Sequence, residues 1–151
     1  MSTTNWNLTT CNITNHTSSV LAVNNVFPLA SGEYGQYPAA VPPNATASPA
    51  FILQSVDSSE TGPKGTLGYV LPDGTQLTLE FDQQFQAGTA SSFTAILSGG
   101  QFMSYGVLLD CSMSPWNGQG ARWTVNLTVS VPPWDRSGPP PGAAAQCQYT
   151  R

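Results

Sequence analysis

Charged residues are scarce in this sequence. Only 8% of the 151 residues are Asp, Glu, Lys or Arg, about a third of the fraction that is usual in globular domains. Four basic residues and a net charge of -4 cannot supply the positive patch that nucleic acid requires. The same scarcity excludes a polybasic segment that would attract anionic lipid. Any membrane binding must therefore rest on aromatic side chains and neutral hydrogen bonds.

Side chains suited to catalysis are also few. The single histidine, His16, lies in a polar turn, where a solvated side chain is expected, and the sequence contains no G-x-S-x-G nucleophile elbow. Glu80 and Asp82 form a carboxylate pair, but together with Thr78 they are the polar side of one amphipathic segment. We therefore expect neither enzymatic activity nor a cofactor.

Cysteine is limited to three positions, Cys11, Cys111 and Cys147, which are far apart and show no C-x-x-C spacing. Three scattered thiols and one histidine make a poor ligand set for zinc, so no metal site is expected. Two interpretations remain open for these residues. They are buried or incidental thiols, or one disulfide ties Cys147 back to the body of the protein.

Long apolar runs are missing as well. The first residues, MSTTNW, contain neither the basic nor the apolar region of a signal peptide. No run approaches the roughly eighteen apolar residues that a membrane-spanning helix needs. We expect a protein that is synthesised in soluble form without a signal peptide and is released by lysis or by an unconventional route.

Short segments with a period of two residues dominate the chain. The clearest are a hairpin at 65–82, which turns at Pro72-Asp73-Gly74, and the segment 121–131, where Trp123, Val125 and Leu127 alternate with polar residues. Further strands are expected at 8–13, 20–23, 51–55, 92–97 and 102–111. Helical periodicity is nearly absent. The pattern predicts an all-β fold, an antiparallel β-sandwich or barrel.

The chain divides into one domain and a tail. We place the β-sandwich at residues 1–131 and a Pro/Gly/Ala-rich C-terminal tail at 132–151, because proline has no N–H for a sheet and cannot enter its centre. Residues 28–49 are also rich in proline, glycine and alanine, and we expect them to form a long extended loop on the surface.

Aromatic residues are the least ordinary feature, because five of them lie among Gly, Pro and Gln in expected loops: Tyr34, Tyr37, Phe85, Trp116 and Trp134. Aromatic rings with a polar atom favour both the lipid–water boundary and the faces of sugars. If several emerge at one end of the sandwich, they form a binding surface. The alternative is that each ring folds back onto a sheet edge.

Three stretches, taken in order, resemble the aegerolysin family over residues 9–100: ITNHTSSVLAV, GEYGQYP and FILQSVDSSETGPKGTLGYVLPDGTQLTLEFDQQFQAG. The Gly/Thr-rich turn of the family falls at 61–66 and its final motif at 81–85. Tyr34 stands where the family usually has Trp, Gln83-Gln84 replace Asn-Pro, and Pro63-Lys64 alter the turn. The hairpin is also weakly similar to that of actinoporins.

The aegerolysin resemblance implies a β-sandwich that binds membrane lipids, commonly sphingolipids with or without sterol, and that has no enzymatic activity. It implies the small component of a two-component pore-forming cytolysin, insecticidal in some bacterial pairs. Such a protein acts extracellularly on target-cell membranes and recruits a larger pore-forming partner. Whether it forms a homo-oligomer stays open.

The resemblance and the loop aromatics together indicate seven residues as candidates for lipid binding. Tyr34 and Tyr37 are the expected interfacial anchors, Phe85 and Trp116 are supplementary ones, and Asp57, Glu60 and Lys64 would contact the charged parts of a headgroup. The principal rival is a carbohydrate-binding, lectin-like β-sandwich, because Tyr and Trp also stack on pyranose rings. A third hypothesis is a module that binds only protein.

Overall fold

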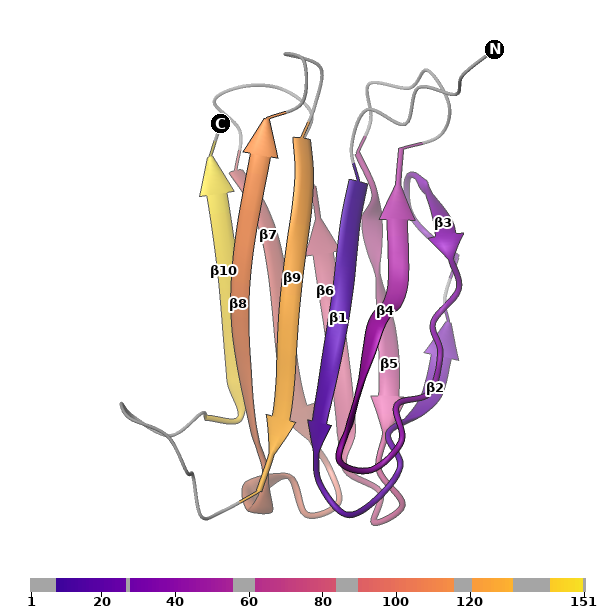
Figure 1. The fold of residues 1–151 in the computed structure, drawn as a ribbon, viewed down its shortest axis with the longest axis vertical. Coiled ribbons are helices and arrows are strands. Elements are labelled where there is room, and N and C mark those ends of the chain that lie inside the picture. The colour runs from indigo at the N-terminus through magenta and orange to yellow at the C-terminus, as the bar shows by residue number, and fades with distance from the viewer. Residues whose placement is uncertain are drawn as a thin grey trace.

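Two five-stranded sheets face each other in the structure, a computed structural model that describes residues 8–26, 28–55, 62–83, 90–115, 121–131 and 142–150 (Figure 1). One sheet has the order β3-β4-β1-β9-β8 and the other β10-β7-β6-β5-β2. The strands are β1 (Leu8–His16), β2 (Ala22–Val26), β3 (Glu33–Gln36), β4 (Ala45–Gln54), β5 (Lys64–Val70), β6 (Gln76–Asp82), β7 (Ala90–Ser98), β8 (Gly106–Pro115), β9 (Ala121–Ser130) and β10 (Ala144–Thr150). The predicted all-β sandwich is confirmed.

The core forms where the inner faces of the two sheets meet. Along β1 and β6, buried residues alternate with partly exposed ones, as the two-residue period of a strand requires. Large buried side chains come from both sheets, among them Phe51 on β4, Tyr69 on β5, Phe93 on β7 and Trp123 on β9. No helix among the described residues is long and apolar enough to span a membrane.

One pair of neighbouring strands is parallel, although an antiparallel sandwich was expected. β1 lies between β4, with which it is antiparallel, and β9, with which it is parallel from Leu8↔Arg122 to His16↔Ser130. The paired residues are more than a hundred positions apart in the sequence. The pairing could therefore not be predicted from a turn between the two strands. Both sheets are otherwise built from antiparallel pairs among the described strands.

The predicted hairpin is present as β5 and β6, which pair in register from Lys64↔Asp82 to Val70↔Gln76. In its turn the Asp73 carboxylate accepts a hydrogen bond from the Thr75 N–H at 2.9 Å. Gly74 has a φ of 90°, a conformation that side-chain-bearing residues rarely adopt. The local sequence thus dictates this turn.

The expectation of a long loop at 28–49 is wrong, because this segment contains β3 and the start of β4. Proline made the segment resemble a loop. Pro49 lies inside β4, where the pairing with β1 shifts between Cys11 and Ile13, and such an irregularity tolerates a residue without an N–H. The expected strand at 102–111 also begins later, at Gly106, after a short 3₁₀ helix, η1 (Phe102–Ser104).

The expectation that residues 132–151 form only a tail is also wrong, because they contain β10. β10 pairs antiparallel with β7, from Ala144↔Ile96 to Thr150↔Ala90. It occupies the edge of its sheet, with β7 as its neighbour. In the folded chain, exposed and half-buried residues alternate over 142–148, as the two-residue period of a strand requires.

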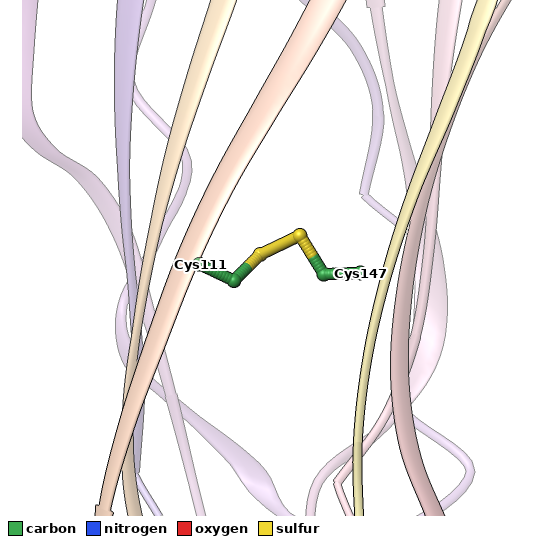
Figure 2. The surroundings of a disulfide bond; sticks show 2 residues. All are labelled: Cys111 and Cys147. Carbon is green, nitrogen blue, oxygen red and sulfur yellow. A yellow bond between two sulfur atoms is a disulfide. The ribbon is translucent and has the colours of Figure 1, made fainter.

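A disulfide joins Cys111 on β8 to Cys147 on β10 (Figure 2). These two strands are the edges of different sheets, so the bond closes one side of the sandwich. Of the two interpretations left open for the cysteines, the disulfide is confirmed for this pair. Cys11 is free and fully buried, and burial raises the pKa of its thiol, which therefore stays protonated.

The hydroxyl of Tyr105 donates a 2.6 Å hydrogen bond to Asp73, which ties the β5–β6 turn to the chain after η1. This bond lowers the pKa of Asp73 and raises that of Tyr105 to about 12. Tyrosine in an unfolded chain ionises near pH 10 and aspartic acid near pH 4. Stabilisation by this bond is therefore complete at neutral pH, is lost in acid as Asp73 protonates, and is lost between about pH 10 and 12 as Tyr105 ionises.

We expect Tyr105→Phe to remove this part of the pH dependence. The measurement is the free energy of unfolding of wild type and variant at about pH 8 and about pH 11. The difference between the two proteins should shrink at the higher pH. A difference that is the same at both pH values would contradict the assignment.

Candidate functional site

Two stacked tyrosines mark the edge of one sheet. Tyr34 lies on β3, an edge strand, and Tyr37 follows its end. Their ring centroids are 5.0 Å apart with 28° between the planes. Tyr34 packs against the core, whereas Tyr37 is 70% exposed. The pair therefore consists of one anchored ring and one that faces solvent.

A bulge explains why these two rings meet. Residues three apart in a regular strand point to opposite faces. The pairing of β3 with β4 shifts between Tyr34 and Gln36, and such a shift lets Tyr37 return to the side of Tyr34. Between the two rings, Gly35 leaves room for the side chains of Gln54 and Ile52 on β4, which a Cβ at this position would approach to 2.5 and 3.0 Å.

The rings border a hollow of about 360 Å³, which we call the tyrosine groove. Its lining consists of Val26, Pro28, Leu29, Gly32, Glu33, Tyr34 and Tyr37. Val26 is 40% exposed at the end of β2, and β2 and β3 are edge strands of different sheets on the same side of the sandwich (Figure 1). The groove is thus a largely apolar surface on the side opposite the disulfide.

Glu33 is the one charged side chain in this lining. Its carboxylate accepts a 2.7 Å hydrogen bond from Nε2 of Gln54, which holds it beside β4. Burial, and then the neighbouring Tyr37, raise the pKa of Tyr34. The Tyr34 hydroxyl is therefore neutral at physiological pH, and the groove offers apolar rings, two phenol groups and one carboxylate.

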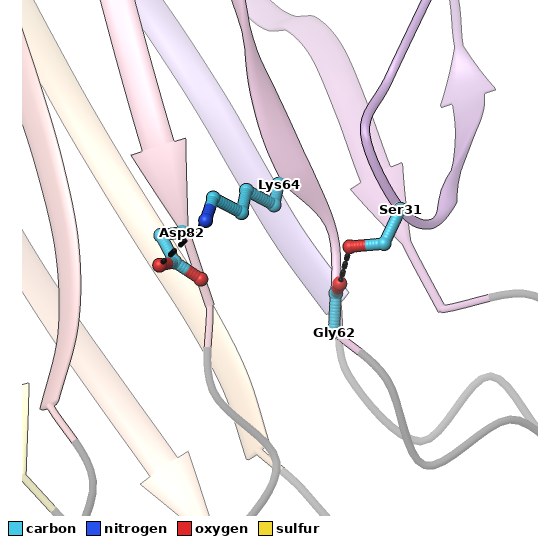
Figure 3. A network of polar contacts seen from close by, with 4 residues as sticks. All are labelled: Ser31, Gly62, Lys64 and Asp82. Atoms are coloured by element: carbon cyan, nitrogen blue, oxygen red, sulfur yellow. Dashed lines mark hydrogen bonds and ion pairs between the residues drawn. The ribbon is translucent and has the colours of Figure 1, made fainter.

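The other predicted residues do not join this groove within the described chain. Lys64 is described, but its ammonium lies 3.9 Å from the Asp82 carboxylate and lines a different hollow, on β5 and β6 (Figure 3). Asp57, Glu60, Phe85 and Trp116 lie outside the described residues, as does Trp134. Of the seven predicted residues, the structure brings together Tyr34 and Tyr37.

Sequence reasoning missed the apolar part of the groove, namely Val26, Pro28 and Leu29. The signal was present as an apolar run broken by proline where β2 ends. Among the described residues, no three His, Cys, Asp or Glu side chains gather in a way that could hold a metal ion.

No protein-family model matches the sequence, and no curated protein matches it. Solved structures do. The lipid-binding protein Nakanori superimposes with a TM-score of 0.63 at 10% identity, over 82% of this chain and 70% of Nakanori. RahU, solved in complex with Tris, gives a TM-score of 0.63 at 13% identity, over 84% of this chain and 96% of RahU.

This chain shares the fold of Nakanori and RahU. At identities this low the likeness concerns the β-sandwich alone. It agrees with the sandwich that the aegerolysin resemblance implies, although the sequence itself matches no family model.

Proposed function

We propose that this chain is an aegerolysin-type protein that binds membrane lipids through the tyrosine groove. The observation that carries the proposal is the Tyr34–Tyr37 stack, whose outer ring is 70% exposed beside the exposed Val26. A phenol ring has an apolar body and a polar tip, and such rings favour the boundary between lipid and water. The fold shared with a lipid-binding protein supports the same reading.

The expected affinity is modest. Burying on the order of 100 Å² of apolar surface from Tyr37 and its neighbours contributes roughly 2.5 kcal/mol at 25 cal/mol per Å². The net charge of -4 gives no long-range attraction to anionic membranes. Binding should therefore be reversible and insensitive to salt, and several copies on one membrane would strengthen it.

The finer proposal follows the sequence resemblance. The lipid is a sphingolipid, with or without sterol, and the protein is the non-enzymatic small component of a two-component cytolysin, insecticidal in some pairs. It docks on the target membrane from outside the cell and recruits a larger pore-forming partner. In this scheme the chain alone binds vesicles without releasing their contents.

Liposome sedimentation tests the proposal, with vesicles of phosphatidylcholine alone or with sphingomyelin or ceramide phosphoethanolamine, each with and without sterol. We expect Tyr37→Ala to lower the affinity for these vesicles by about tenfold, which corresponds to about 1.4 kcal/mol. The change should leave the melting temperature nearly unaltered, because Tyr37 is exposed. Adding Tyr34→Ala should abolish binding, at some cost in stability.

Met103→Ala is the matched control. Met103 is 85% exposed on η1, which lies far from β3 in the sandwich (Figure 1), so its loss should leave binding unchanged. Undiminished binding of the Tyr34→Ala/Tyr37→Ala protein would remove the groove from the proposal. Binding to glycans and to none of the vesicles would favour the lectin-like rival.

A further inference from the structure

A second hollow, of about 470 Å³, lies over the outward-facing residues of β5, β6, β7 and β10. The polar side chains that argue for a site there are Lys64, Thr66, Glu80, Asp82, Thr94 and Gln146. The hollow shares no lining residue with the tyrosine groove. We call these six side chains the polar row.

Strand register brings the polar row together. Thr66 is opposite Glu80, Glu80 is opposite Thr94, and Thr94 is opposite Gln146, so four side chains form one line across four strands. With strands about 4.8 Å apart, this line is roughly 14 Å long. Lys64 and Asp82 form a second line, two residues further along β5 and β6, and their side chains point toward each other (Figure 3).

Four of the six side chains in the polar row are available to hydrogen-bond a ligand. Within the described part of the chain, the side chains of Thr66, Glu80, Thr94 and Gln146 have no hydrogen bond or ion pair. The Lys64–Asp82 contact is long, at 3.9 Å. Hydroxyl, carboxylate and amide groups are therefore available side by side over one hollow.

The outer face of the other sheet is different. There Nδ2 of Asn12 donates to Oδ1 of Asn126 at 3.0 Å, and Ser48 donates to Oδ1 of Asn12 at 3.1 Å. Thr14 and Thr46 are hydrogen-bonded to each other at 3.0 Å. These polar side chains satisfy one another, whereas Thr66, Glu80, Thr94 and Gln146 of the polar row are open to a ligand.

The chemistry of the polar row selects among ligands. Carboxylates accept hydrogen bonds, while hydroxyls and the Gln146 amide both donate and accept, which suits a ligand with several adjacent hydroxyl groups. The two carboxylates and one ammonium leave a charge of -1 in the hollow, which opposes phosphate, sulfate and other anions. Phe81 is the one large apolar side chain among the described lining residues and is only 5% exposed, so the hollow presents no large exposed apolar side chain to an acyl chain.

We infer that the polar row is a binding site for a neutral saccharide, separate from the lipid site proposed above. Glu80 and Gln146 hydrogen-bond the hydroxyl groups of the sugar, and Thr66 and Thr94 complete the contacts along the row. A protein with both sites would engage a glycan and the bilayer of the same cell at once, and the two weak contacts would reinforce each other.

NMR titration of the ¹⁵N-labelled protein tests the inference, with the methyl glycosides of glucose, galactose, mannose and N-acetylglucosamine as ligands. At least one should shift the amides of residues 66, 80, 94 and 146 in a saturable manner. Glu80→Gln and Thr94→Val should each weaken that binding by about tenfold. Both residues lie on the outer face, so the melting temperature should change little.

Glu33→Gln is the control for Glu80→Gln, because it removes a carboxylate from the tyrosine groove instead, and it should leave sugar binding unchanged. Tyr37→Ala should weaken liposome binding and leave sugar binding unchanged, so the two proposals can fail independently. No saturable shift with any of the four glycosides, together with no binding to a glycan array, would overturn the inference. Shifts confined to other residues, or unaltered affinity in both polar-row variants, would do so too.

Discussion

Cys147→Ser should lower the free energy of unfolding by roughly 4 kcal/mol, because the disulfide closes a loop with a sequence separation of 36 residues and loops of this size restrict the unfolded chain by about that amount. β10 depends on this bond. Its described side chains, 144–148, are exposed or only half-buried, and it pairs only with β7. Urea unfolding of wild type and variant measures the difference.

The double variant Cys111→Ser/Cys147→Ser supplies the control. It should be about as unstable as the single variant, because either change removes the same bond. A strong reductant should lower the stability of the wild type to that level and leave the double variant unaffected. Equal stability of the wild type with and without reductant would contradict the prediction.

Hydrogen exchange would localise the effect. Without the bond, amides of β10 should exchange faster, while those of β9, which pairs on both sides with β1 and β8, should keep their protection. Uniform loss of protection across both strands would mean that the bond stabilises the whole sandwich rather than the edge strand.

Asn15→Ala should destabilise the protein by about 4 kcal/mol, because it removes all the hydrogen bonds of a fully buried side-chain amide. Asn15 is fully buried at the end of β1. Its Nδ2 donates to the carbonyls of Ser19, Val41 and Pro42 at 2.8, 3.1 and 3.2 Å. Its Oδ1 accepts from the N–H and the hydroxyl of Thr17. The Asn15 side chain thus connects two loops. Thermal unfolding of wild type and variant measures the stability that its removal costs.

Asn12→Ala is the matched control on the same strand. The Asn12 side chain bonds to Asn126 on the exposed face of the sheet, where water can replace the lost partner. We expect the free energy of unfolding to change by no more than about 0.5 kcal/mol. Similar losses of stability in the two variants would contradict the prediction that the hydrogen bonds of Asn15 stabilise the protein more than those of Asn12.

Part of the candidate site could be predicted from the sequence. Tyr34 and Tyr37 stood out because aromatic rings between Gly, Pro and Gln have no strand pattern to bury them. That they stack could not be foreseen, because it depends on a bulge between β3 and β4, and β3 lies in the segment that was expected to be a loop. Of the polar row, Glu80 and Asp82 were interpreted as the solvated side of one strand and Lys64 as a headgroup contact. Gln146 could not be joined to them, because β10 lies far from β6 in the sequence.

By itself, the sequence determined those features of the fold that depend on residues close together in the chain. Alternation in 65–82 and 121–131 specified strands with one buried face, and Asp73-Gly74 specified the turn between β5 and β6. The scarcity of charge likewise limited which partners the surface can attract. Each of these follows from local backbone preference or from composition alone.

Only the tertiary structure decided which strands are neighbours. The parallel pairing of β1 with β9, the edge position of β10 and the choice of Cys111 as the partner of Cys147 all join residues far apart in the chain. Such pairings are selected by how two complete sheets pack over one core, and alternation in a single strand carries no information about its partner. The tyrosine groove and the polar row follow from those pairings.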